Sequence, residues 1–207
     1  MKNYPKKMKN YYFTILAICF SAALNAQEAF WNVTNYRGAF PVTDNTPATN
    51  WASGWSNFDP ENAVYGAPTS TVSTDITTNT TWSGVVLLQN KVFVKNNAVL
   101  TIQPGTIIRG DKLTQGTLII TRGAKIVADG TQEKPIVFTS NSPVPRSGDW
   151  GGIVLLGKAS VNTAFTGTGG GQGIYQAEGG IDNSFGDGLA GGGTSPNDAD
   201  NSGILRY

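Results

Sequence analysis

Oxygen-bearing side chains alternate near the end of the sequence. Asp198, Asp200 and Ser202 are followed by Gly203. Hard cations such as Ca²⁺ take several oxygens from closely spaced side chains, so this alternation is a candidate calcium site. A calcium loop also needs a later bidentate carboxylate and usually a following helix, whereas residues 204–207 are predicted to form a strand. A solvated turn that returns the chain to a strand is therefore favoured over a metal site, and no other cofactor is expected.

Residues that could serve a polysaccharide-cleaving enzyme are scattered along the second half of the chain. Glycoside hydrolases use two carboxylates about 5 to 9.5 Å apart, and the candidates are Asp149, Glu178, Asp182 and Asp187. A lyase would combine calcium with a basic residue, for which Arg146 and Lys158 are the candidates. No regular spacing places acidic residues at equivalent positions. The sequence therefore assigns no catalytic residue.

Histidine is absent from all 207 residues. This excludes a Ser-His-Asp triad, histidine-ligated zinc and an imidazole general base within this sequence. The only cysteine, Cys19, lies in a segment that is expected to be removed. The mature chain then has neither a disulfide nor thiolate chemistry.

Residues 1–26 are predicted to be a signal peptide. Four lysines precede the apolar run from Phe13 to Leu24, and small residues precede Gln27. The apolar run is shorter than the ~20 residues that span a bilayer, so we expect export to the cell surface or the medium and no transmembrane segment in the mature chain. Removal of the four lysines changes the formal charge from +1 to −3, which leaves no basic surface for nucleic acid.

Short apolar segments recur at an almost constant spacing. One series consists of residues 100–102, 118–120, 136–138 and 153–155. A second series runs in step with the first, at Ile107, Ile126, Val144 and Val161. Turn residues separate the segments, and the segments are too short and too β-branched for helices. The pattern predicts an all-β solenoid, a parallel β-helix, in which Leu100, Leu118 and Ile136 occupy equivalent inward positions.

Two regions depart from this period. Residues 27–80 contain aromatic residues among turn residues and are predicted to form an N-terminal cap over the open end of the solenoid. Trp51 and Trp55 within this region could instead stack on sugar rings, although clustered tryptophans are more often buried than displayed. In the solenoid region, 81–207, a glycine-rich insertion at about 163–202 is expected to be a mobile, exposed excursion. The final strand ends without a cap, so the protein is expected to continue beyond Tyr207.

Several motifs resemble those of a known group of proteins. Leu100-Thr-Ile-Gln-Pro-Gly-Thr-Ile-Ile-Arg-Gly110, Gly123-Ala-Lys-Ile-Val-Ala-Asp-Gly-Thr131, Pro135-Ile-Val-Phe-Thr-Ser140 and Gly148-Asp-Trp-Gly-Gly152 are similar to segments of the secreted β-helix proteins of Bacteroidetes. The resemblance implies a right-handed parallel β-helix on a large exported protein, often a substrate of type IX secretion. The C-terminal sorting domain of such proteins is not found in this sequence.

Two functions are consistent with these observations. The first is a non-catalytic protein of the cell surface or the medium, adhesive or in contact with surface glycans or other surface proteins. The second is a carbohydrate-active enzyme, a polysaccharide lyase or a glycoside hydrolase, whose catalytic coils lie beyond Tyr207. A fold alone does not decide between them.

Overall fold

The computed structural model describes residue 56 and residues 60–207. The unit Asn57–Tyr207 consists of short strands, and η1 (Pro60–Asn62), a single 3₁₀ turn, is the only helical element among the described residues. Valine, isoleucine, leucine and threonine fill the strands, because branched side chains pack well on a pleated surface. The strands pair in parallel and form a β-helix, so the predicted fold is confirmed.

Four coils of the chain stack on one another. The first coil has β1 (Ser70–Val72), β2 (Thr80–Trp82) and, between them, a bridge from Ile76 to Val94. The second has β3 (Val85–Leu88), β4 (Lys91–Val94) and β5 (Val99–Ile102). The third has β6 (Ile107–Gly110), β7 (Thr117–Ile120) and β8 (Lys125–Asp129). The fourth has β9 (Val137–Ser140), β10 (Gly152–Leu155) and β15 (Gly203–Arg206).

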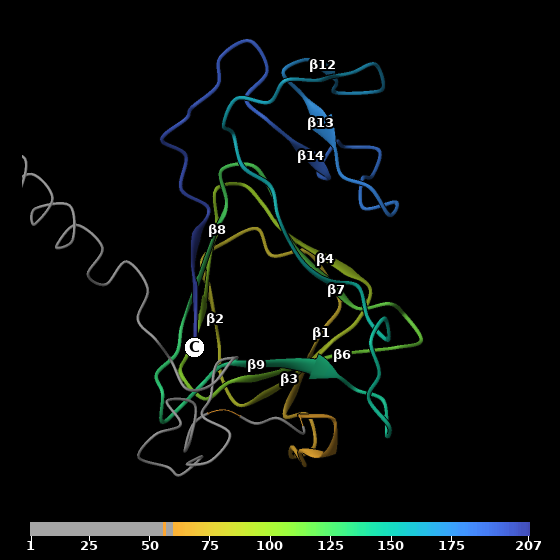
Figure 1. Ribbon diagram of the computed structural model, residues 1–207, viewed down its shortest axis with the longest axis vertical. Coiled ribbons are helices and arrows are strands. Elements are labelled where there is room, and N and C mark those ends of the chain that lie inside the picture. The colour runs from red at the N-terminus through yellow and green to blue at the C-terminus, as the bar shows by residue number, and fades with distance from the viewer. Residues whose placement is uncertain (1–55, 57–59) are drawn as a thin grey trace, which may run out of the picture. The chain divides into compact units, whose positions relative to one another are not determined.

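The coils build three parallel sheets. The first sheet has the order β1-β3-β6-β9, the second β4-β7-β10 and the third β2-β5-β8-β15. Viewed along the stack, the sheets form the three sides of a triangle (Figure 1). Parallel neighbours need a long crossover, and here the other two sides of each coil provide it.

The core lies inside the triangle. Alternate residues of each strand point inward, as the period of two requires: Val92 and Val94 of β4 are fully buried, and so are Leu118 and Ile120 of β7 beside them. The third sheet contributes Leu100, Ile102 and Ile126. The inward side chains of all three sheets thus form one continuous apolar column.

The predicted register of the repeat is wrong. Leu100 lies in the third sheet and Leu118 in the second, whereas Ile136 directly precedes β9 of the first. All three are buried, but one interval of the repeat carries the chain to a different sheet rather than to the next coil of the same sheet. Val144 and Val161 of the second series lie in loops.

The glycine-rich insertion folds into two antiparallel hairpins between β10 and β15. One hairpin pairs β11 (Ala164–Phe165) with β12 (Gly171–Gln172), and the other pairs β13 (Tyr175–Gln176) with β14 (Leu189–Ala190). Leu189 is 1% exposed and Ile174 6%. Many residues of the insertion are exposed, but it also forms regular hairpins and buries a few apolar side chains of its own. Its mobility stays a prediction.

The insertion covers the outer face of the second sheet. Phe93, Ile119 and Val154 pair across β4, β7 and β10 and point away from the core. They pack against residues of the insertion: Ala177, Ile181 and Ala190. Polar contacts hold the insertion at its margins, where the Lys91 ammonium donates to the Gly180 carbonyl and Arg122 Nη1 donates to the Gly191 carbonyl at 3.2 Å.

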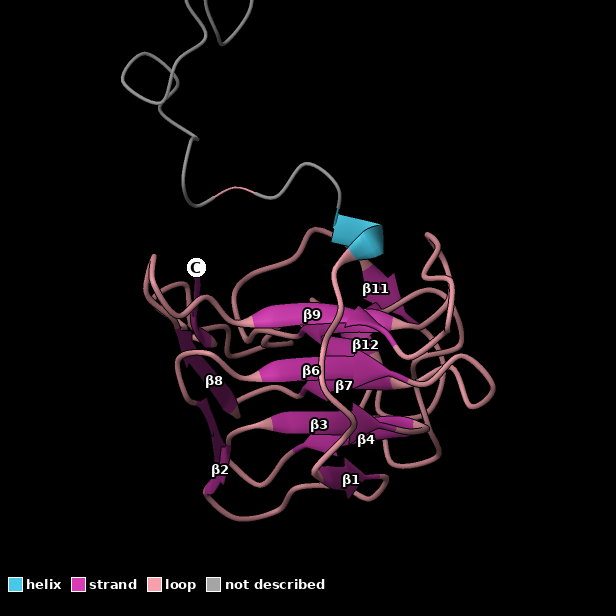
Figure 2. Cartoon of the chain, turned by 90° about the horizontal axis from the view of Figure 1, so that it is seen from below, coloured by secondary structure: helices cyan, strands magenta, loops and turns pink. Residues whose placement is uncertain are grey.

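The segment before β1 crosses the outer face of the first sheet (Figure 2). Arg109 Nη1 donates to the Gly66 carbonyl at 2.9 Å, and the Thr69 amide donates to the Val85 carbonyl at 2.7 Å. From η1, beside the fourth coil, this segment thus descends to the first coil. The strand β1 lies within the region 27–80 in which a cap was expected.

Candidate functional site

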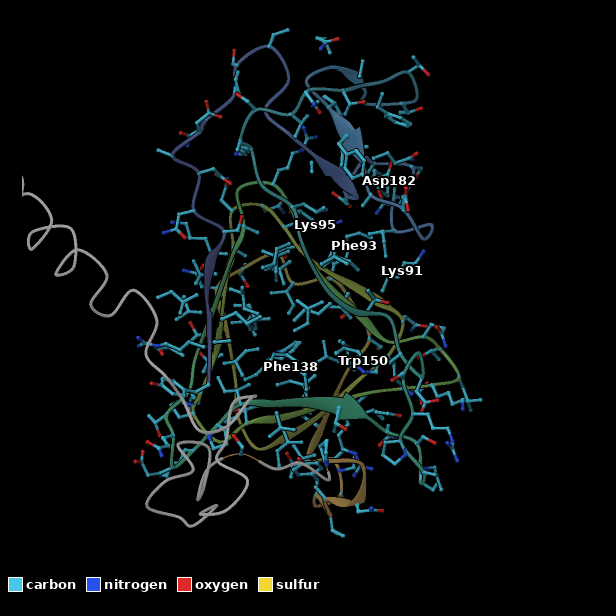
Figure 3. All side chains as sticks on the ribbon, in the orientation of Figure 1. Lys91, Phe93, Lys95, Phe138, Trp150 and Asp182 are labelled. Carbon is cyan, nitrogen blue, oxygen red and sulfur yellow. The ribbon has the colours of Figure 1, made fainter. Side chains whose placement is uncertain are left out.

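A hollow of about 860 Å³ opens at the end of the stack, at the fourth coil. Phe138 of β9 and Trp150 form its apolar surface and lie inside the triangle of sheets (Figure 3). Pro60 and Asn62 of the crossing segment form one wall, and residues 143–147 form another.

The register of the first sheet explains the position of Trp150. Leu88, Gly110 and Ser140 follow one another at the same inward position in coils two to four. A Cβ atom on Gly110 would lie 2.5 Å from the indole ring of Trp150, so the ring lies directly against the glycine backbone. Because Gly110 of the third coil has no side chain, Trp150 of the fourth coil fits over it. Trp150 packs on the core and also lines the hollow.

Asp149 fixes the loop that carries Trp150. Its side chain is 4% exposed. One carboxylate oxygen accepts hydrogen bonds from Ser140 Oγ and the Arg146 amide, both at 2.9 Å, and the other lies 2.8 Å from Lys112 Nζ. The Lys112 ammonium, together with the Arg146 amide and the Ser140 hydroxyl, holds the pKa of this carboxyl below its usual range. The loop is therefore anchored to two coils through a charged, buried group.

The rim of the hollow is polar. Arg146 is exposed there and makes no side-chain ion pair with any residue that the structure describes, and Thr139 and Ser147 bring hydroxyl groups. A flat aromatic surface packs on an apolar ring face, while a guanidinium and hydroxyls bind the oxygens around that ring. An apolar floor with a few polar groups at the rim is a common form of ligand site.

Comparison with protein families identifies the family of this chain. A model described as a pectate-lyase-like β-helix domain matches residues 71–207, about two thirds of the chain. The chain belongs to this family. Among curated proteins and among solved structures, no match was found. In the described part of this pectate-lyase-like β-helix, no helix is long and apolar enough to cross a membrane.

The predicted calcium ligands lie where the insertion returns to the β-helix. Asp198 Oδ1 accepts a hydrogen bond from the Ser160 amide at 2.8 Å, and Asp200 Oδ2 accepts one from the Lys158 amide at 3.0 Å. The contact with Ser160 lowers the pKa of Asp198. The two aspartates, two residues apart, thus accept hydrogen bonds from two backbone amides that are also two residues apart on the facing segment. The described residues contain no group of three or more His, Cys, Asp and Glu that could hold a metal ion.

The candidate catalytic acids lie in two parts of the fold. Asp149 anchors its loop at the corner between the first and second sheets, whereas the other three lie in the insertion. Asp182 accepts hydrogen bonds from the Gly188 amide and the Gln176 side chain, and Asp187 accepts one from Lys95. Glu178 is exposed.

Sequence reasoning did not assign the residues of the hollow to a site. The sequence presents Trp150 only as part of a motif and Arg146 only as a candidate base of a lyase. A signal was present in Gly110, a glycine at the inward position of a strand, which indicates the close approach of another group. Trp51 and Trp55, the predicted stacking pair, lie outside the described residues.

Proposed function

We propose that this pectate-lyase-like β-helix belongs to an exported protein that contacts glycans without cleaving them. The observation that carries the proposal is the hollow with Trp150 and Phe138 as its floor and Arg146 at its rim. Its volume of about 860 Å³ lies within the range of small-ligand sites, about 300 to 1,000 Å³. Binding partners are then surface glycans, or surface proteins that carry them.

The state of the acidic groups supports a role without catalysis. A glycosidase needs a general acid with a raised pKa. Asp149 directly precedes Trp150, which lines the hollow. Its pKa is lowered because the Lys112 ammonium forms an ion pair with it and because the Arg146 amide and the Ser140 hydroxyl donate hydrogen bonds to it. A carboxylate held in this way stays ionised at neutral pH and does not deliver a proton.

Export is part of the proposal and is supported by the sequence features of residues 1–26. The cationic start, the apolar run and the small residues before Gln27 are typical of a secretory signal. Placement at the cell surface or in the medium would bring the hollow into contact with glycans. Type IX secretion is suggested by the resemblance alone.

A glycan array with the full chain tests the function, combined with an assay for new reducing ends on every glycan that binds. We expect binding without release of reducing ends. Arg146→Ala should weaken binding about tenfold, as the loss of a charge-assisted hydrogen bond implies, and Trp150→Phe should weaken it while retaining an aromatic ring over Gly110.

Leu113→Ala is the matched control, because Leu113 is 92% exposed and does not line the hollow. Its affinity should equal that of the parent chain. Absence of binding to every glycan, equal binding by all four proteins, or steady release of reducing ends would each contradict the proposal.

A further inference from the structure

A second pocket, of about 270 Å³, lies between the crossing segment and the outer face of the first sheet. Residues 63–65 of the crossing segment form one side of this pocket. Arg109 of β6 and Thr139 of β9 form the opposite side. The pocket adjoins the hollow at Trp150 and shares part of its lining, but Arg109 lines the second pocket and not the hollow.

The register of the first sheet brings two of these side chains together. Arg109 pairs with Thr139 in the neighbouring coil. Ile108, next to Arg109, is fully buried in the core, so the period of two turns Arg109 and Thr139 outward. Arg109 Nη1 donates to the Gly66 carbonyl at 2.9 Å, which holds the guanidinium against the crossing segment.

The Arg109 guanidinium has no counter-charge in the described part of the chain. Its Nε atom is buried and makes no hydrogen bond, and Arg109 forms no ion pair with any carboxylate whose side chain the structure describes. The Asp149 carboxylate, which accepts from Ser140 of the same pocket, is paired with Lys112. Because a charge that loses water is costly unless it is paired, Arg109 favours an anion in the adjoining pocket.

Two hydroxyl groups accompany this guanidinium. Tyr65 of the crossing segment and Thr139 of β9 line the pocket and are half-buried. Neither hydroxyl makes a hydrogen bond to another residue that the structure describes. The described lining residues include no Asp or Glu. The pocket thus offers hydrogen-bond donors from two opposite sides and no described carboxylate that would repel an anion.

We propose that this pocket binds a free tetrahedral oxyanion, inorganic phosphate. The Arg109 guanidinium neutralises the ion and donates to its oxygens, as planar guanidinium donors suit phosphate. The Tyr65 and Thr139 hydroxyls donate to the remaining oxygens. Phosphate offers four oxygens to donors on both sides of the pocket, whereas a planar carboxylate offers two. The bound ion links the first sheet to the crossing segment and does not depend on glycan binding at the hollow.

Calorimetric titration of the full chain with sodium phosphate at constant ionic strength tests the proposal. Arg109→Gln should weaken phosphate binding about tenfold or more, and Arg109→Lys should weaken it less because the charge remains. Tyr65→Phe and Thr139→Val should each weaken binding about two- to tenfold, as the loss of one hydrogen bond implies. Sodium acetate should bind to the parent chain at least about tenfold more weakly than phosphate.

Arg122→Gln is the matched control. Arg122 also donates through Nη1 to a backbone carbonyl, that of Gly191, and forms no ion pair with a described carboxylate, but it does not line this pocket. Arg122→Gln should bind phosphate within about twofold of the parent chain, because a charge at a distance is screened. Circular dichroism checks that each variant is folded.

The side-chain Nε–H signal of Arg109 gives a second measurement, by NMR. Burial of Nε slows its exchange with water, so the signal can be observed, and its loss in Arg109→Gln assigns it. The signal should shift progressively as phosphate is added to the full chain. The Nε–H signal of Arg122 should not shift.

No binding of phosphate, an equal loss in Arg122→Gln, or equally tight binding of acetate would overturn the proposal. Equally tight binding of glycerol 3-phosphate would also overturn it, because the site would then belong to a phosphate ester rather than to the free ion. An equal loss in Arg146→Ala would place the anion at the rim of the hollow instead. Glycan binding that depends on Trp150 would leave the proposed function standing in each case.

Discussion

Shortening Ile119 to alanine tests whether the insertion is packed on the β-helix. Ile119 points out of the core from β7, between Phe93 and Val154, and is fully buried by the insertion. Ile119→Ala removes about three methyl or methylene groups at about 0.8 kcal/mol each, so about 2.4 kcal/mol is lost by transfer alone. The cavity left behind adds to this loss, so the expected cost is about 2.4 to 5 kcal/mol.

Thermal unfolding of the full chain measures this cost. In a unit of this size a loss of about 2.4 kcal/mol corresponds to a fall of about 5 to 10 °C in Tm. Hydrogen exchange should also become faster in residues 177–190, because the insertion loses its main apolar contact. Ile204→Ala is the control, since Ile204 is 46% exposed on the outer face of β15. Equal Tm values for the two variants, with unchanged exchange in the insertion, would refute the packing.

Three further predictions follow from the contacts of single residues. Leu118→Asp should prevent folding, because it places an unpaired charge between Val92 and Ile153. Leu113→Asp should be tolerated, because Leu113 is exposed. A soluble Leu118→Asp chain with an unchanged melting curve would contradict the register. Asp149→Asn should lower Tm most at neutral pH. Because the pKa of Asp149 is lower in the folded chain, its carboxylate stabilises the fold fully above the unfolded pKa of about 3.9, and this stabilisation is lost as the pH falls through the folded pKa. A difference in Tm between the parent chain and Asp149→Asn that persists in acid would count against the ion pair with Lys112. Millimolar calcium should leave Tm unchanged, since Asp198 and Asp200 already accept backbone hydrogen bonds, and a rise in Tm abolished by Asp198→Asn would establish a calcium site instead.

The strands of this fold could be predicted from the sequence, but their stacking could not. Apolar triplets such as 118–120 stand out because each coil buries them, whatever sheet they belong to. The register depends on loop lengths that vary from coil to coil: Val92 pairs with Leu118 one coil later, whereas the next coil, from Leu118 to its partner Ile153, includes the longer loop before β10. A nearly constant spacing of apolar triplets therefore predicted the fold class without the order of strands.

The candidate site could be predicted even less, because its parts come from separate coils. The sequence presents Asp149 only as one of four candidate catalytic acids, and its anchoring role could not be predicted, because its partners Lys112 and Ser140 are brought to it by the third and fourth coils. The hairpins of the insertion could not be predicted for a related reason. Its many glycines predict a mobile, exposed excursion, but they also permit tight turns around a few buried residues such as Leu189, and the apolar surface that it covers is supplied by β4, β7 and β10.

The most direct test of glycan contact at the hollow is the response of the tryptophan indole signals in an NMR titration with a glycan that the array identifies. The chain has five tryptophans, and Trp150→Phe assigns the signal of Trp150 by its loss. We predict that this signal shifts progressively with added glycan, while that of Trp82, which is 5% exposed in the core, stays unchanged. A titration that moves only the signals of Trp51 and Trp55, or that moves none, would contradict the account.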